Sequence, residues 1–226
     1  MGKTMGVLII GTGWVSGEHL RAYQKNPHTE IRGLCDLHPE KAERVRTEHG
    51  LDCPVGSDYR QMLERGDIDI VSVCTIHSGH YEQTAASLEA GKHVMVEKPL
   101  CTSLEQARRL KELTEKSGRK TAVGFVVRWY SAIRTLKNMV GAGLIGEPYY
   151  LECDYWHEVA PGWKSSAAAA GTALLTGGVH AIDTMRYFQK PGIDAAEVFA
   201  YSHPPGRRHD FTYDPTVVLT VKFENG

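Results

Sequence analysis

Short apolar runs that alternate with helical segments are the dominant feature of the first 124 residues. Each run is followed by glycine or polar residues. The runs lie at residues 7–10, 30–35, 69–74, 93–97 and 120–127. Near-continuous apolar runs are typical of strands buried on both faces, and strands that alternate with helices form right-handed βαβ units. We therefore predict an N-terminal α/β domain, residues 1–124, with a doubly wound parallel sheet.

A different pattern begins at about residue 125. A helical segment and a glycine-rich turn are followed by stretches in which apolar and polar residues alternate. These stretches lie at residues 149–157, 197–202 and 217–223. Such alternation favours a second α/β domain, residues 125–226, with a large open sheet that is mostly antiparallel or mixed. Because the last predicted strand leaves an unpaired edge, we expect this domain to be incomplete here.

Composition excludes several classes of protein. The net charge of −1 gives no electrostatic reason to expect nucleic acid or a membrane surface as a partner. The 5 cysteines are scattered without a C-x-x-C pair, which suits free thiols in a reducing compartment and argues against a zinc site. No apolar run approaches the ~18 residues of a membrane span, and the apolar run at residues 7–10 is shorter than we expect for a signal peptide. We expect a cytoplasmic protein without a metal.

A glycine turn follows the first predicted strand directly. Gly11-Thr12-Gly13 leads into a helical segment near Glu18. A strand, a glycine turn and a helix form the context of a dinucleotide-binding fingerprint, in which the backbone approaches a pyrophosphate at the helix N-terminus. We predict cofactor contacts from five consecutive residues, Gly11, Thr12, Gly13, Trp14 and Val15. The third glycine of the fingerprint is replaced by Ser16, so a purely structural turn is the alternative.

An aspartate ends the second predicted strand. Asp36 lies about 20 residues after the glycines, the spacing at which an acidic side chain binds a ribose 2′-hydroxyl. Residues 37–39 contain no arginine for a 2′-phosphate, so the pattern favours NAD over NADP. The alternative is that Asp36 caps the helix that opens at Pro39.

Polar residues also follow the next two predicted strands. Thr75 and His80 come after one strand, and the other reads Val-Met-Val-Glu-Lys-Pro at 94–99. Ligands bind at the carboxyl ends of strands in open α/β sheets. We therefore predict that Thr75, His80, Glu97 and Lys98 line the cofactor pocket, with Lys98 as a catalytic group. The alternative is that Lys98 pairs with Glu97 on the surface. A Lys-Pro bond also permits a cis peptide.

Five motifs together resemble the Gfo/Idh/MocA oxidoreductase family. They are Gly11-Thr12-Gly13 with Asp36, Cys74-Thr75 with His80, Glu97-Lys98-Pro99, residues 144–148 and residues 177–183. The resemblance implies an N-terminal Rossmann domain, an open-sheet C-terminal domain for substrate binding and oligomerisation, and NAD or NADP as cofactor. It also implies a sugar, polyol or glycoside substrate and a homodimer or homotetramer formed through the C-terminal sheet. The family lysine maps onto Lys98, and the family histidine maps onto His180.

The chain departs from this family at one position. Many of the family's dehydrogenases carry an aspartate four residues before the histidine, and here that position is Thr176. Lys98 and His180 then remain as the acid–base pair, and Thr176 becomes a substrate ligand. Asp183 shares a helical face with His180 and is expected either to orient it or to act as a cap. The alternative for His180 is a buried structural histidine.

The second domain also offers candidates for a sugar site. Arg128, Trp156 and His157 are predicted to contact substrate, because aromatic faces stack on sugar rings and polar groups bind hydroxyls. Tyr155 and Trp163 belong to the same aromatic region, for which ordinary sheet packing is the alternative. The alanine run Ala167–Ala170 is either a short helix or a flexible lid.

Three functions remain open from the sequence. The first is an NAD-dependent sugar, polyol or glycoside dehydrogenase. The second is a glycoside hydrolase or lyase that oxidises its substrate transiently, without net redox change. The third is a non-catalytic subunit that binds NAD.

Overall fold

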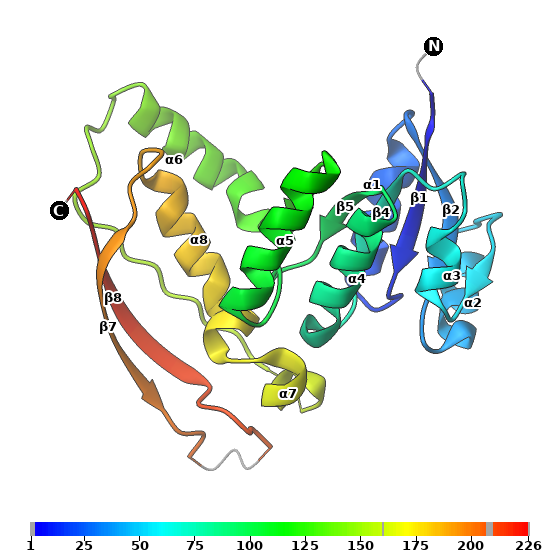
Figure 1. Ribbon diagram of the computed structural model, residues 1–226. Helices are drawn as coiled ribbons and strands as arrows, with labels where there is room; N and C mark the ends of the chain where they lie inside the picture. Colours follow the sequence, from blue (N-terminus) through cyan, green and yellow to red (C-terminus); the bar gives the residue numbers. More distant parts are fainter. Residues whose placement is uncertain (1–2, 160, 207–209, 226) are drawn as a thin grey trace. The chain divides into compact units, whose positions relative to one another are not determined.

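The computed structural model describes residues 3–159, 161–206 and 210–225, and the chain divides into two compact units, Met1–Gly124 and Phe125–Gly226 (Figure 1). The first unit contains a parallel sheet of six strands. These are β1 (Met5–Ile10), β2 (Thr29–Cys35), β3 (Val55–Gly56), β4 (Ile70–Val73), β5 (His93–Val96) and β6 (Thr121–Val123). The predicted α/β class and parallel sheet are confirmed.

The strand order creates the position at which a ligand can bind. The sheet runs β3-β2-β1-β4-β5-β6, so the chain reverses its direction of travel between β1 and β4. The crossovers carry α1 (Ser16–Lys25), α2 (Pro39–Glu48), α3 (Tyr59–Leu63), α4 (His77–Glu89) and α5 (Leu104–Ser117). The strands β1 and β4 thus form the topological switch point of the sheet, and open α/β sheets bind ligands outside the carboxyl ends of the strands at such a point.

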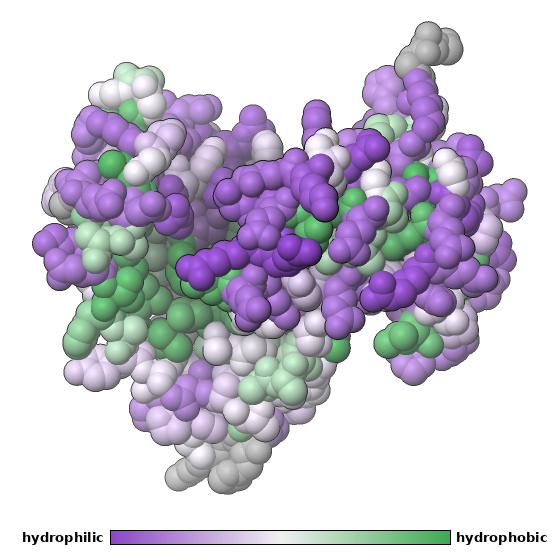
Figure 2. Space-filling view, viewed as in Figure 1, coloured by the Kyte–Doolittle hydropathy of each residue, from purple (hydrophilic) through white to green (hydrophobic). Residues whose placement is uncertain are grey.

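Both faces of the sheet are buried, as the continuous apolar runs predict. Leu8 and Ile10 of β1 join one core cluster with residues of α3, α4 and α5, whereas Val7 and Ile9 join another with residues of α1 and α2. This division follows the alternation of side chains along a strand. The outer face of α5 is hydrophilic (Figure 2) and carries ion pairs such as Lys111–Glu115.

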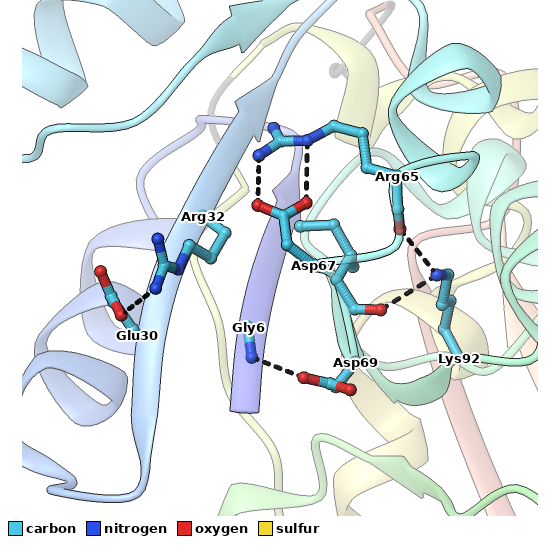
Figure 3. Close-up of polar contacts among 8 residues, drawn as sticks. Gly6, Glu30, Arg32, Arg65, Asp67, Asp69 and Lys92 are labelled. Atoms are coloured by element: carbon cyan, nitrogen blue, oxygen red, sulfur yellow. Dashed lines mark hydrogen bonds and ion pairs between the residues drawn. The ribbon is translucent and has the colours of Figure 1, made fainter. Parts of the chain in front are cut away.

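A polar network closes the amino-terminal edge of this sheet (Figure 3). The Lys92 Nζ atom donates to the carbonyls of Arg65 and Ile68, at 3.0 and 2.9 Å. Asp69 accepts from the Gly6 amide at 2.9 Å, and the Arg65 guanidinium pairs with Asp67 through two hydrogen bonds. These contacts fix the loop between α3 and β4 against the start of β1.

The second unit combines helices with a two-stranded antiparallel sheet. A 3₁₀ turn (Val126–Trp129) precedes α6 (Ser131–Gly141), and α7 (Ala167–Ala170) is a single turn. A π-helical turn (Leu174–Gly178) leads into α8 (Val179–Phe188). Strands β7 (Ala195–His203) and β8 (Thr216–Phe223) then pair antiparallel, with His203 opposite Thr216. The expected antiparallel pairing is thus confirmed, and the alanine run is a short helix.

Several predicted boundaries differ from the structure. Residues 149–157 form no strand, because within the described residues of this unit only β7 and β8 pair, and a lone extended segment has no ladder to join. The strand predicted at 120–127 is limited to Thr121–Val123, since the chain turns into a 3₁₀ segment at Val126. The two-residue strand β3 was not predicted. None of the helices in the described part of the chain has the length and apolarity needed to cross a bilayer.

We expect Gly6→Ala to destabilise the first unit strongly. A Cβ atom at this position would lie 1.8 Å from the Asp67 carbonyl oxygen, so the backbone of β1 or of the loop at Asp67 must move. The loss should exceed about 2 kcal/mol, in the range of core disruptions. Urea denaturation followed by circular dichroism measures it.

Gly66→Ala is the matched control for this experiment. Gly66 directly precedes Asp67 in the loop after α3, but a Cβ atom there would meet nothing within 4 Å. Its stability should stay within about 0.5 kcal/mol of wild type. Equal effects of the two substitutions would contradict the steric argument.

Candidate functional site

The glycine turn after β1 is built for close approach of two strand ends. Gly11 has φ +88°, and a Cβ atom there would lie 2.7 Å from Thr75 Cγ2 and 2.8 Å from the Cys74 carbonyl. A residue with a side chain would be strained and would also collide with the loop after β4. Gly11 therefore brings together the carboxyl ends of β1 and β4 at the switch point.

The next residues of the turn leave space and hydrogen-bond donors. A Cβ atom at Gly13 would meet nothing within 4 Å. The amides of Gly13, Trp14 and Val15 donate to no other group in the described part of the chain. The Ser16 hydroxyl, in place of the third glycine, donates to the Gly13 carbonyl at 2.6 Å and stays buried. Open space before unpaired amides at the start of α1 fits a dinucleotide pyrophosphate.

Asp36 is held in one orientation beside this turn. Its Oδ2 atom accepts from the amide and the hydroxyl of Thr12, at 2.8 and 2.9 Å, and Oδ1 accepts from the His38 amide at 3.0 Å. Burial alone would raise the pKa of Asp36, but these hydrogen bonds outweigh burial and lower it. The N-cap of α2 is His38, so Asp36 does not occupy the cap position that was its alternative.

His80 and Thr75 are held by hydrogen bonds within the first unit. The His80 ring is fully buried, with Nδ1 at 2.6 Å from the Pro99 carbonyl and Nε2 at 3.0 Å from the Thr75 carbonyl. Both ring nitrogens face main chain, so His80 ties these two segments together, and its contact with a cofactor stays a prediction. The Thr75 hydroxyl donates to Gln83 at 2.6 Å. The tie holds the end of β4 against the segment just after Lys98, where the Lys98–Pro99 peptide is cis.

Glu97 is buried and pairs with a residue that sequence reasoning missed. His19 Nε2 lies 3.0 Å from Glu97 Oε1, and His19 Nδ1 lies 2.8 Å from the Ser72 hydroxyl. The side chains of His19 and Glu97 are only 10% and 11% exposed. Glu97 is therefore buried, and the alternative in which it forms a surface pair with Lys98 is wrong. Helical spacing was the available signal, since His19 shares the inward face of α1 with Ser16, Leu20 and Tyr23.

In the second unit, His180 of α8 is buried beside an aromatic ring. It lies in the first turn of α8, is 7% exposed, and stacks on Tyr155 with ring centroids 5.6 Å apart. Thr176 lies one turn earlier and is also buried. The Thr176 hydroxyl donates to the Thr172 carbonyl at 2.9 Å.

Arg128 and Asp183 form a pair that was not predicted. The Arg128 guanidinium donates through Nε and Nη2 to the two carboxylate oxygens of Asp183, at 2.6 and 2.5 Å. The same guanidinium lies 5.1 Å from the centroid of the Tyr187 ring. Both carboxylate oxygens of Asp183 therefore accept from Arg128. Arg128 anchors the 3₁₀ turn to α8 through two of its five N–H donors, and its contact with substrate stays a prediction.

An open groove of about 840 Å³ crosses the second unit. It runs between residues 148–159 and strand β8, and Thr176 also lines it. Trp156 and His157 both border this groove, and Trp156 is 89% exposed. These two predicted sugar contacts thus line the same groove. Within the residues that the structure describes, no group of three or more histidine, cysteine, aspartate or glutamate side chains is placed to hold a metal.

Two family models match this chain. The model described as an oxidoreductase family with an NAD-binding Rossmann fold matches residues 5–125, and the GFO/IDH/MocA C-terminal domain matches residues 133–226. Together the two matches extend over nearly all of the chain.

Individual relatives agree with these models. Inositol 2-dehydrogenase 3 of Saccharopolyspora erythraea is 32% identical over 96% of this chain and 62% of the relative. D-glucoside 3-dehydrogenase of Escherichia coli is 32% identical over 80% of this chain and 53% of the relative. The crystal structure of an oxidoreductase domain protein from Kribbella flavida has a TM-score of 0.89 at 27% identity, covering 100% of this chain and 65% of its own. The chain thus spans about three-fifths of the length of the curated relatives it matches.

We expect the stability of the first unit to fall with rising pH because of His19. Burial opposes a charged ring, but interactions with Cys74 and Glu97 outweigh it and raise the pKa of His19 from 6.5 to about 10. The stabilisation is therefore complete below pH 6.5 and lost as the pH passes about 10. Urea titrations across this window should show a free energy of unfolding that declines more steeply in wild type than in His19→Gln. Some decline remains in both above pH 9.0, because burial raises the pKa of the Cys35 thiol from 9.0 to about 12. The exposed His28 is the control, and His28→Gln should keep the wild-type slope; a flat wild-type profile would refute the charged pair.

Proposed function

Because the chain belongs to the Gfo/Idh/MocA oxidoreductase family, we propose that the protein is an NAD-dependent dehydrogenase for a secondary hydroxyl of a sugar, polyol or glycoside. The observation that carries this proposal is the arrangement of the first unit, in which an oriented Asp36 carboxylate lies beside unpaired amides at the start of α1. The names of two relatives, an inositol and a glucoside dehydrogenase, support the substrate class. We assign cofactor binding to residues 1–124 and substrate binding and oligomerisation to residues 125–226.

The preference for NAD follows from the charge and position of Asp36. Its carboxylate is anionic and fixed by Thr12 and His38, so it can accept a hydrogen bond from a ribose 2′-hydroxyl. A 2′-phosphate would meet the same negative charge and be repelled. Gly13, Trp14 and Val15 would donate their amides to the pyrophosphate. When bound, the nicotinamide supplies the hydride acceptor.

Removal of the hydroxyl proton is assigned to Lys98 and His180. Lys98 follows β5 at the carboxyl edge of the sheet, the edge at which open α/β sheets bind ligands. Its amine takes the proton, and a neighbouring positive nicotinamide favours the neutral amine that this step needs. His180, buried against Tyr155, relays the proton or binds the hydroxyl. Thr176, Trp156 and His157 contact the substrate along the groove.

Lys98→Met should abolish turnover and leave NAD binding intact. General acid–base groups contribute about 10²–10⁴-fold, so we expect a fall of at least ~100-fold. Turnover is measured by nicotinamide absorbance with myo-inositol, methyl glucosides and free hexoses, and binding by NADH fluorescence. Lys111→Met is the matched control, because Lys111 is exposed on α5 and pairs only with its own helix at Glu115 among the described contacts.

The result of the same assay separates the other two functions. Preserved turnover in Lys98→Met would overturn the assignment of the base. Product release without net NADH would point to a hydrolase or lyase with transient oxidation. Binding of NAD without turnover of any compound would point to a non-catalytic subunit.

Asp36→Ala should weaken NAD binding and relax the preference over NADP. Loss of a charge-assisted hydrogen bond of about 1.5–3 kcal/mol corresponds to roughly 10- to 100-fold in the ratio of the two dissociation constants. Fluorescence titration with NADH and NADPH gives this ratio. Asp52→Ala, an exposed aspartate of the same unit, should leave it unchanged. An unaltered ratio in Asp36→Ala would exclude the ribose contact.

A further inference from the structure

A nearly buried charge pair joins helix α1 to the strand end that carries Lys98. His19 Nε2 lies 3.0 Å from Glu97 Oε1, and Glu97 Oε2 accepts from the Lys98 amide at 3.3 Å. Helix α1 is also the helix whose N-terminus faces the space beside Gly13. The pair therefore connects α1 to the main chain of Lys98 through the Glu97 carboxylate.

The surroundings leave this carboxylate little freedom to move. A Cβ atom on Gly124 would lie 2.8 Å from Glu97 Oε1, so the β6 side is closed by backbone. On the other side, the Ser72 hydroxyl lies 2.8 Å from His19 Nδ1 and fixes the ring. His80 holds the carbonyl of Pro99 from the opposite end of the segment. Lys98 thus lies between two residues whose positions are each fixed by a histidine.

We propose that His19 is a positioning residue for Lys98, which orients the Glu97 carboxylate and balances its charge beside the Lys98 amine. This inference rests on the proposed function, in which Lys98 accepts the proton. Glu97 interacts electrostatically with Lys98. An unbalanced carboxylate at this position would favour the ammonium form of Lys98, which cannot act as a base. The positive charge of a protonated His19 ring offsets the effect of the Glu97 carboxylate on the Lys98 amine.

Four other titratable groups face the pair and enter the same balance. Lys98 follows Glu97 in the chain, Cys74 lies at the end of β4, and Tyr23 lies one turn beyond His19 on α1. His80 interacts electrostatically with Glu97 from α4. Of these, Lys98 alone carries the proposed proton transfer, so its titration reports the balance.

The test is the pH dependence of acylation at Lys98. Wild type, His19→Gln and the double variant His19→Gln/Glu97→Gln are labelled with acetic anhydride over a range of pH, and the Lys98 peptide is quantified by mass spectrometry. We expect the labelling midpoint to rise by about one pH unit or more in the single variant, the scale of one unbalanced neighbouring charge. It should return toward wild type in the double variant, where the carboxylate is also removed.

The controls distinguish positioning from a loss of structure. Lys111 in the same samples is the internal reference, and His28→Gln is the matched histidine control. A purely structural role would lower the melting temperature and leave the Lys98 midpoint in place, which would overturn the proposal. Should His19→Gln fail to fold, nitrogen NMR of ¹⁵N-histidine-labelled wild type decides: a doubly protonated His19 ring at pH ~8 is expected, and a neutral ring overturns the charge balance.

The labelling experiment needs neither a dinucleotide nor a substrate. A shifted midpoint in a protein without dehydrogenase activity would count against the proposed function alone. An unshifted midpoint in an active dehydrogenase would count against the role of His19 alone. In an active enzyme, the proposal also expects a lower kcat for His19→Gln at neutral pH, recovered at higher pH.

Discussion

Parallel pairing of β1 with β4 is the interaction on which the first unit depends. Ile10 pairs with Val73, so both strands end at the same level and Gly11 meets Cys74 directly. The crossovers leave these two ends in opposite directions, which makes them the topological switch point of a doubly wound sheet. The start of α1, the Asp36 carboxylate and the segment of Lys98 all take their positions from this pairing. A side chain at Gly11 would force the two ends apart.

Ion pairs fix the positions of neighbouring elements in both units. Removing one partner of a buried ion pair leaves an uncompensated charge in the interior, so such pairs tolerate few geometries. His19–Glu97 ties α1 to the end of β5, and Arg128–Asp183 ties the 3₁₀ turn to α8. Each pair lies next to a residue with a proposed role in proton transfer, Lys98 in one unit and His180 in the other. Removing His19 would leave an uncompensated buried charge on Glu97, next to Lys98 in the chain.

Periodicity predicted the parts of the fold that depend on local pattern. The apolar runs of the first 124 residues became strands, because runs buried on both faces have few alternatives. The alternating residues of β7 and β8 paired as expected for an antiparallel sheet. The aromatic stretch at 149–157 has a similar pattern and is not a strand, since pairing requires a partner edge and not pattern alone. Propensity left Ala167–Ala170 open, and the structure resolved it as one helical turn.

The sequence by itself determined the fold class, the position of the glycine turn and the acidic residue after β2, because each depends on residue type at a short, regular spacing. It also marked Lys98, since charge at the end of an apolar strand is a local signal. Only the tertiary structure decided the partners of the polar side chains. Glu97 pairs with His19, which lies 78 positions away in the chain. Asp183 accepts hydrogen bonds from Arg128, and the His80 ring contacts main-chain carbonyls. Long-range hydrogen bonds are set by how helices dock on the sheet, and no spacing along the chain encodes that geometry.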